Sequence, residues 1–344
     1  MIRSSVLLFI PAALLAQSET LKVQTRLVVV PAMVNGATAR PVLDLPAERF
    51  TLLDNGVPQP FTLETIGTGV APIALIVAVQ NSGISASALA KVRRIGGMIQ
   101  PLITGERGCA GLVTFAETVE WRQECTADAN RLSTAFARIG TGKERSGRML
   151  DAALESIRKL SNAQGHRRVL LLISESRDRG GKTDLDTVIA AAQAAGVTIY
   201  AATYSAFRTG FVAKSEDVER PRESSKPKID ALEPNSRPGM AKTPHPNASN
   251  RVDLAAGLGE LTRLGNVKST EAMARATGGA EFPFTQLTGL ETAIEKLGEE
   301  LHAQYVLSFS PKNPAPGYHA LTVTVALPKV TVRARPGYFA NAAQ

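Results

Sequence analysis

The chain has few of the residues that most often carry catalysis or bind transition metals. Its 344 residues include two cysteines and four histidines. The histidines do not have the spacing of metal ligands, so exposed positions or hydrogen-bonded core positions are expected for them. No set of nucleophile, base and acid stands out along the chain. The sequence therefore predicts a protein that is not an enzyme and has no cofactor.

Beyond its N-terminus the sequence also lacks a long apolar run. Residues 1–16 contain one basic residue, an apolar stretch interrupted by Pro11, and small residues near Ala16. This pattern is typical of a cleaved secretory signal peptide; the alternatives are a buried first strand or a membrane anchor. The stretch is shorter than the roughly 20 apolar residues that span a bilayer. We therefore expect a secreted or periplasmic protein without a membrane span.

A clustered basic stripe is absent as well. The formal net charge is +8, but lysines and arginines are spread along the chain. Binding to nucleic acid usually requires clustered basic residues, so a solvated basic surface is the preferred interpretation. The alternative is loose attraction to an anionic surface of the cell envelope. The hydrophobic content of 44% is that of a globular protein.

The two cysteines flank a predicted hairpin. Residues 110–115 and 119–124 are expected to be strands joined by a tight turn near Glu117. In a hairpin centred on residue 117, Cys109 and Cys125 are directly opposed, at a spacing that a disulfide bridges. Export would supply the oxidising compartment that such a bond needs. The alternatives are two buried free thiols or one catalytic thiol.

The order of predicted elements indicates the fold. Residues 20–66 and 305–340 are rich in strands, whereas residues 70–304 alternate between strands and helices. Such alternation predicts an α/β domain with a doubly wound, mostly parallel sheet and helices on both faces. The two chain ends are expected to pack together as a small β unit. Within the α/β domain, the proline-rich residues 207–250 are expected to form a disordered insertion.

Individual elements follow from caps and periodicity. Strands are predicted at 73–79, 110–115, 119–124, 169–173 and 197–203, and helices at 86–100, 128–139, 147–160, 184–195, 268–277 and 287–302. In the C-terminal segment, strands are predicted at 304–310, 320–327 and 330–335.

The order of these segments resembles the von Willebrand factor type A domain, and more closely the von Willebrand factor A-related proteins that are abundant in acidobacteria. The resemblance covers nearly all of the chain after the signal peptide. It depends on the segments Phe50-Thr-Leu-Leu-Asp-Asn-Gly-Val-Pro-Gln-Pro-Phe61, Gly105-Glu-Arg-Gly108, Val113-Thr-Phe-Ala116, Tyr305-Val-Leu-Ser-Phe-Ser-Pro311 and Arg333-Ala-Arg-Pro-Gly-Tyr-Phe339.

Domains of this family often hold a divalent cation between three loops, through an Asp-x-Ser-x-Ser segment, a Thr and an Asp. The resemblance places Gln80, Ser82 and Ile84 on the first segment, and a shifted register would instead bring in Ser85 and Ser87. The Thr falls on or beside Gly147, next to Ser146, and the last Asp falls on Glu175, with Arg177 nearby. A hard cation needs several oxygen ligands and negative charge, which this set supplies poorly. Binding of Mg²⁺ is the less favoured alternative.

Gln80 is instead interpreted as an uncharged hydrogen-bonding plug at the end of the first strand. The resemblance implies that the surrounding loops form a degenerate adhesion site; its candidate binding residues are Gln80, Ser82, Ser85, Ser146, Glu175 and Asp178. The function expected is that of an exported, non-catalytic module that binds a protein, the extracellular matrix or an envelope component. The alternatives are a structural component of the cell envelope without a discrete ligand site, or a hydrolase with an unrecognised active site.

Overall fold

The computed structural model describes residues 27–65, 71–82, 86–143, 146–204, 268–312 and 314–340. The predicted signal peptide, the predicted insertion at 207–250 and Ser85 lie outside the described residues. Among the described residues, no helix is long and apolar enough to cross a membrane.

A six-stranded sheet forms the centre of the molecule, in the order β10-β9-β8-β5-β6-β7. Its strands are β5 (Ile73–Gln80), β6 (Cys109–Phe115), β7 (Val119–Thr126), β8 (Arg167–Ser174), β9 (Val197–Thr203) and β10 (Glu281–Pro283). All neighbours are parallel except β6 and β7, which form the hairpin. This confirms the predicted mostly parallel sheet, although the short strand β10 was not predicted.

Helices cover both faces of the sheet, which explains why every residue of β5 is buried. One face packs against α1 (Ala86–Val92), α2 (Gly96–Ile99), α3 (Ala129–Ala137) and α9 (Leu287–Ala303); the other packs against α4 (Met149–Leu160), α5 (Leu185–Ala195) and α8 (Ser269–Thr277). Side chains of β5 alternate between the two apolar clusters, with Leu75 and Val77 on the first and Ile76 and Ala78 on the second.

The predicted helix at 86–100 is not continuous. It is divided into α1, α2 and a π-helical turn, η4 (Gln100–Thr104), which ends at Gly105. Gly96 and Gly97 favour the break because glycine is a poor helix former. Gly96 also lies against α3 so closely that a β-carbon there would be 2.8 Å from the β-carbon of Phe136.

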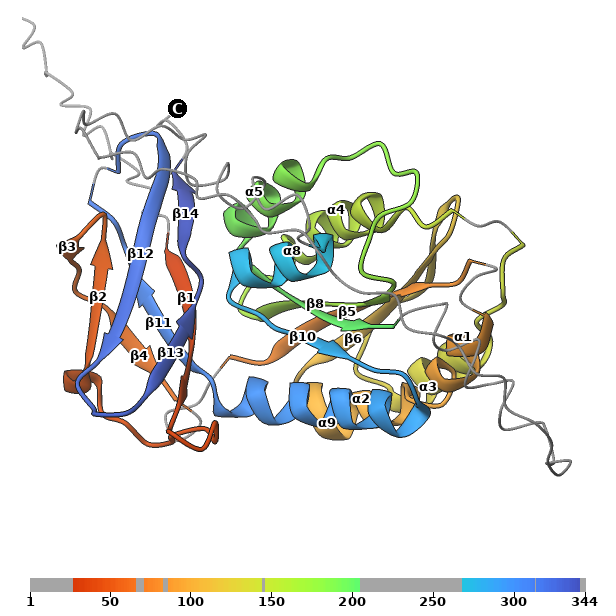
Figure 1. Cartoon of the computed structure of the whole chain (residues 1–344), viewed down its shortest axis with the longest axis horizontal. Helices are drawn as coiled ribbons and strands as arrows, with labels where there is room; N and C mark the ends of the chain where they lie inside the picture. Colours follow the sequence, from red (N-terminus) through yellow and green to blue (C-terminus); the bar gives the residue numbers. More distant parts are fainter. Residues whose placement is uncertain are drawn as a thin grey trace, which may run out of the picture.

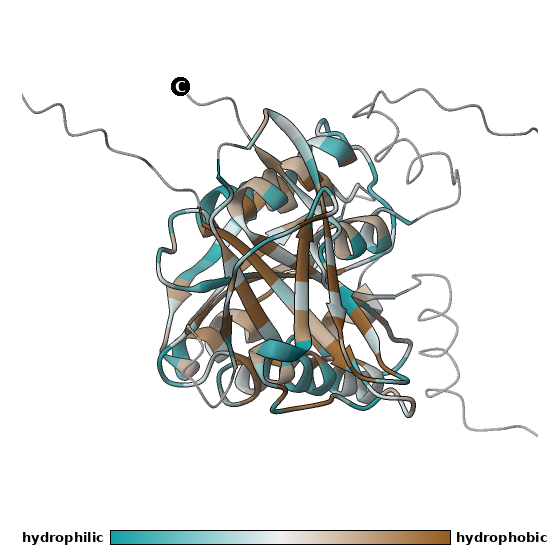
Figure 2. Ribbon diagram, turned by 90° about the vertical axis from the view of Figure 1, so that its left-hand side faces the viewer, coloured by the Kyte–Doolittle hydropathy of each residue, from teal (hydrophilic) through white to brown (hydrophobic). Residues whose placement is uncertain are grey.

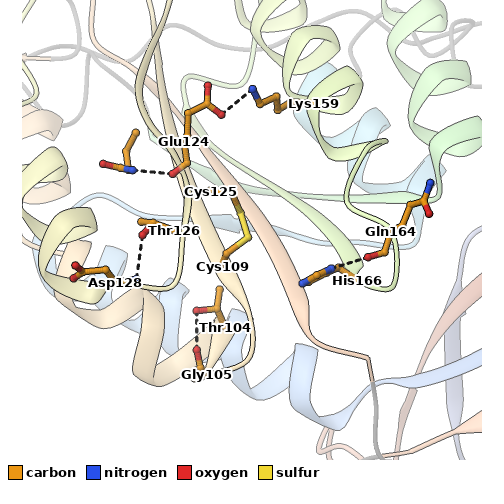
Figure 3. The surroundings of a disulfide bond; sticks show 11 residues. Thr104, Gly105, Cys109, Glu124, Cys125, Thr126, Asp128, Lys159, Gln164 and His166 are labelled. Carbon is orange, nitrogen blue, oxygen red and sulfur yellow. Dashed lines mark hydrogen bonds and ion pairs between the residues drawn. A yellow bond between two sulfur atoms is a disulfide. The ribbon is translucent and has the colours of Figure 1, made fainter.

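Strands from both ends of the chain form the second unit, as predicted. One antiparallel sheet has the order β13-β1-β11-β4 and the other the order β14-β12-β2-β3. The strands are β1 (Val28–Asn35), β2 (Phe50–Asp54), β3 (Val57–Pro58), β4 (Thr62–Glu64), β11 (Tyr305–Phe309), β12 (Gly317–Val325), β13 (Thr331–Ala334) and β14 (Gly337–Ala340), with a short 3-10 helix, η1 (Ala47–Arg49), before β2. Figure 2 faces this unit and shows apolar residues concentrated on its strands. The sequence did not predict β14.

The hairpin holds the predicted disulfide, Cys109–Cys125, with an S–S distance of 1.99 Å and a Cα–Cα distance of 5.3 Å. Its register is only partly as expected. Near the turn Phe115 pairs with Val119, but at the far end Ala110 pairs with Thr126, so the ladder slips between them. Gly111 lies in this irregular stretch, where a β-carbon would be 3.1 Å from the carbonyl oxygen of Gln123. The disulfide therefore forms across a β-bulge, whereas the sequence predicted a regular hairpin with Cys109 and Cys125 directly opposed.

Candidate functional site

The parallel strands of the central sheet end on the side away from the β unit (Figure 1), and the described candidate residues belong to the ends of β5 and β8 and to the loops there. Described residues of three loops meet there: residues 81–82 after β5, residues 140–143 and 146–148 before α4, and residues 175–183 after β8. The last two are joined directly, since Gly147 and Arg179 exchange backbone hydrogen bonds of 2.9 and 3.0 Å. We refer to them as the three top loops.

The side chain of Gln80, the last residue of β5, links two of the loops. Its side chain is buried, with the residue 2% exposed. The amide Nε2 donates to Ser82 Oγ at 3.0 Å, and Oε1 accepts from the backbone N–H of Glu175 at 3.0 Å. One amide thus satisfies a buried hydroxyl and a buried backbone donor at once. This geometry is that of a hydrogen-bonded plug.

The loop before α4 accommodates the plug through Gly147. A β-carbon on Gly147 would be 2.7 Å from Nε2 of Gln80 and 3.1 Å from its Cδ. Any other residue at position 147 would therefore displace the amide or be displaced by it. Ser146, the neighbouring candidate, has a buried Oγ without a hydrogen-bond partner among the described residues.

Glu175 already has a cation beside it. Its Oε2 is 2.9 Å from Nε of Arg179, and the Glu175 side chain is 12% exposed whereas that of Arg179 is 57% exposed. The sequence had drawn attention to Arg177, but the guanidinium that contacts the carboxylate belongs to Arg179. Residues 175–179 form a loop, in which the direction of a side chain does not follow from its spacing along the chain, so the sequence held no signal that favoured Arg179 over Arg177.

Two acids hold the loop after β8 against α4. Asp178 Oδ1 accepts from the backbone N–H of Leu150 at 3.0 Å, and its Oδ2 accepts from the backbone N–H of Gly181 at 2.8 Å. Asp151 Oδ1 accepts from the hydroxyl and the backbone N–H of Thr183, at 2.6 and 3.0 Å. Burial would raise the pKa of Asp151, but hydrogen bonds from Thr183 and Lys182 outweigh burial, so its pKa is lowered.

Asp178 has a structural role that the sequence did not indicate. Each of its carboxylate oxygens accepts one backbone hydrogen bond, and its place in the binding surface stays a prediction. Asp151 and Asn81, which the sequence did not single out, serve the same structural purpose. The backbone carbonyl of Asn81 accepts from Gly142 N at 2.7 Å, and its side-chain amide donates to the carbonyl of Gly140 at 3.2 Å. The three top loops are therefore tied to one another.

This donor set does not fit a divalent cation. Gln80, in place of the first Asp, directs an amide N–H at Ser82, and Gly147 stands where the Thr hydroxyl is needed. Glu175, in place of the last Asp, pairs its carboxylate with Arg179. A hard cation requires oxygen ligands whose charge is not already neutralised. Within the described part of the chain, no cluster of three or more His, Cys, Asp or Glu side chains could hold a metal ion.

Comparison with known proteins gives structural similarity only, since no family model and no curated protein matches the chain. BatB from Bacteroides thetaiotaomicron is 13% identical and has a TM-score of 0.42, over 67% of this chain and 98% of that one. The SpRpn10 VWA domain is 14% identical with a TM-score of 0.30, over 40% and 79%. Proximal thread matrix protein 1 from the mussel byssus, which has a zinc-occupied MIDAS motif, is 10% identical with a TM-score of 0.44, over 74% and 50%.

Sequence identities and TM-scores of this size do not indicate a function. The chain itself has a mostly parallel central sheet with helices on both faces and additional antiparallel sheets. This arrangement is consistent with the von Willebrand factor A-like fold that the sequence resemblance implied. The closer resemblance to the acidobacterial proteins stays a prediction.

Proposed function

We propose that this chain is an exported, non-catalytic binding module whose three top loops recognise a protein, matrix or envelope component without a metal ion. The observation that carries the proposal is the pair Gln80 and Arg179. The Gln80 amide fills the end of β5, and the Arg179 guanidinium provides a positive charge beside Glu175. A cation built into the chain thus takes the electrostatic place that a metal ion would otherwise fill.

The charge on the loops favours an acidic partner. In the described parts of the three top loops, the exposed charged side chains are Lys143, Arg177, Arg179 and Lys182, and none of them is acidic. Among the described residues only Nε of Arg179 has a hydrogen-bond partner, the carboxylate of Glu175, so its two terminal nitrogens have none there and can serve a ligand. A guanidinium presents paired donors that match a carboxylate or phosphate, so Arg179 is well suited to an acidic group on the partner.

The rigidity of the loops also supports recognition. Asp151, Asp178 and Asn81 fix the loop backbones through hydrogen bonds, so little conformational freedom would be lost when a partner binds. The same acids are engaged by backbone donors rather than directed toward a shared reactive point, which is why we place no catalytic step here.

A binding experiment tests this proposal. The protein without residues 1–16 is immobilised and exposed to envelope extract, with and without EDTA, and bound material is quantified for wild type, Arg179→Gln and Arg158→Gln. Arg158 is an exposed arginine of α4 and serves as the matched control. We expect binding that survives EDTA, is lost in Arg179→Gln, is retained in Arg158→Gln and is competed by polyglutamate.

Three outcomes would contradict the proposal. Binding that EDTA abolishes would mean that a metal ion is required after all. Binding that is the same in wild type and Arg179→Gln would remove the top loops from recognition, and absence of any specific binding would favour a structural component of the envelope.

A further inference from the structure

A second site lies at the opposite end of the central sheet, where the α/β domain meets the β unit. A cavity of about 430 Å³ opens there between the first residues of β8, the end of α5 and strands β1, β11 and β14. Its volume is in the range of small-molecule sites in proteins. Nothing in the proposed function uses this cavity, because the three top loops are at the other ends of the same strands.

The polar part of the cavity wall is dominated by arginine. Arg167, Arg168 and Arg335 all line it, whereas Glu64 is the single acid among its described lining residues. Neither Arg167 nor Arg168 forms an ion pair with a described residue. Burial lowers the pKa of both guanidinium groups, which means that the surroundings disfavour their charge.

Backbone carbonyls supply part of the missing negative charge. Arg167 donates to the carbonyl of Leu301 near the end of α9, at 2.8 Å, and Arg168 donates to the carbonyl of Ala195 at the end of α5, at 2.6 Å. Each helix end is equivalent to about half a negative charge. Arg167 also has the carboxylate of Glu64 within electrostatic reach, whereas Arg168 has, in the described part of the chain, only the end of α5, so about half a positive charge remains at Arg168.

Donors and an acceptor remain for a ligand. Arg168 uses Nε and Nη1 for carbonyl groups, and its Nη2 has no hydrogen-bond partner among the described residues. Gln193 also lines the cavity, and its Oε1 is buried without a partner in the described structure. The rest of the wall is largely apolar and includes Val29, Val306 and Phe339.

We infer that this cavity binds a small organic acid with an apolar chain, its carboxylate at Arg168 and a hydroxyl group donating to Gln193. The carboxylate supplies the missing negative charge, the hydroxyl satisfies the buried amide oxygen, and the chain lies against the apolar wall. This site is independent of the top loops, so either proposal can fail without the other.

The test uses 3-hydroxydecanoate as the probe and its methyl ester as the uncharged control, with binding measured by isothermal titration calorimetry on the disulfide-bonded protein. Loss of a charge-assisted hydrogen bond weakens binding by about tenfold or more. We therefore expect the acid to bind at least about tenfold more tightly than the ester, and Arg168→Gln to remove most of that difference. Arg158→Gln, outside the cavity, should bind like wild type.

A second variant keeps the test decisive if Arg168→Gln is poorly folded. Val29 faces away from the β-unit core, between the inward-facing Val28 and Val30, and lines the cavity. Val29→Trp should fill the cavity and abolish binding of the acid while the circular dichroism spectrum stays that of wild type. Equal affinity for acid and ester, no saturable binding of the acid, or binding unchanged in both variants would overturn the inference.

Discussion

Replacement of Gly147 by alanine tests whether the Gln80 plug is held as the structure indicates. The new β-carbon would be 2.7 Å from Nε2 of Gln80, whereas ordinary contacts of this kind begin at 3.4 Å. The backbone of Gly147 is not in the left-handed region, so alanine adds no backbone strain of its own. The amide of Gln80 would have to leave both Ser82 and the backbone N–H of Glu175.

The expected cost follows from those two hydrogen bonds. Each contributes about 1 kcal/mol, and a buried N–H left without a partner adds about 1–3 kcal/mol. Replacing glycine by alanine also stabilises the folded state by about 0.4–1 kcal/mol, because it reduces the conformational entropy of the unfolded chain. We therefore expect Gly147→Ala to lower the free energy of unfolding by about 2–4.5 kcal/mol, measured by urea denaturation with the disulfide intact.

A double-mutant cycle separates this mechanism from general sensitivity of the loop. Gln80→Ala removes the same two hydrogen bonds, and the space it vacates accepts the methyl group of alanine at position 147. The double variant should therefore be no less stable than Gln80→Ala alone, which is strong non-additivity. Gly97→Ala, at an exposed helical glycine with open space around it, is the control and should be neutral or slightly stabilising. Additive losses in the cycle, or a cost below about 0.5 kcal/mol for Gly147→Ala, would refute the plug.

Three further predictions concern stability. Replacing Cys109 and Cys125 by serine should lower the free energy of unfolding by at most about 3 kcal/mol, because the bond closes a loop with a sequence separation of 16 residues that the hairpin already constrains; equal urea midpoints would contradict this. Burial and the hydrogen bond to Asp54 raise the pKa of Tyr338 well above 10.0. The free energy of unfolding should therefore include the full contribution of Tyr338 below about pH 10 and should fall above that pH by up to about 1.4 kcal/mol per pH unit. Urea denaturation of Tyr338→Phe should show a smaller fall over the same pH range. Asp178→Ala removes two backbone hydrogen bonds and should cost about 1–2 kcal/mol in urea denaturation, with hydrogen exchange accelerated first at Leu150 and Gly181.

The fold was predictable where local chemistry and burial agree. The end of the helix at 184–195 was recognised from Gly196, which adopts the left-handed conformation after the last turn, and the structure adds Asp184 as the cap of the first turn. The β5 strand was recognised from an uninterrupted apolar run, since both of its faces are covered. The predicted helix at 86–100 was wrong only in being continuous, because its break coincides with Gly96 and Gly97 and Gly96 also packs closely against α3.

The site was predictable only in part. The family resemblance assigned Gln80, Ser82 and Glu175 to one site, and the structure brings them together because parallel strands end at the same edge of the sheet. It did not reveal that Asp178 is directed toward backbone donors, or that Arg179 rather than Arg177 contacts the carboxylate. Those outcomes depend on side-chain directions within a loop, which have no periodicity to read.

The contacts of Gln80 and Glu175 predict that the top loops do not bind a metal ion, and this prediction can be tested by reversing those contacts. Gln80→Glu replaces the amide by a carboxylate of nearly the same shape, and Arg179→Gln removes the cation beside Glu175. Together they would place two carboxylates and the Ser82 hydroxyl near one another, a set of oxygens that suits Mn²⁺ or Mg²⁺. We expect millimolar Mn²⁺ to raise the Tm of this double variant but not that of wild type. The matched control, Gln80→Glu with Arg177→Gln, keeps the guanidinium on Glu175 and should respond much less. A Tm rise of equal size in both double variants would show that the charge of Arg179 is not what keeps the cation out.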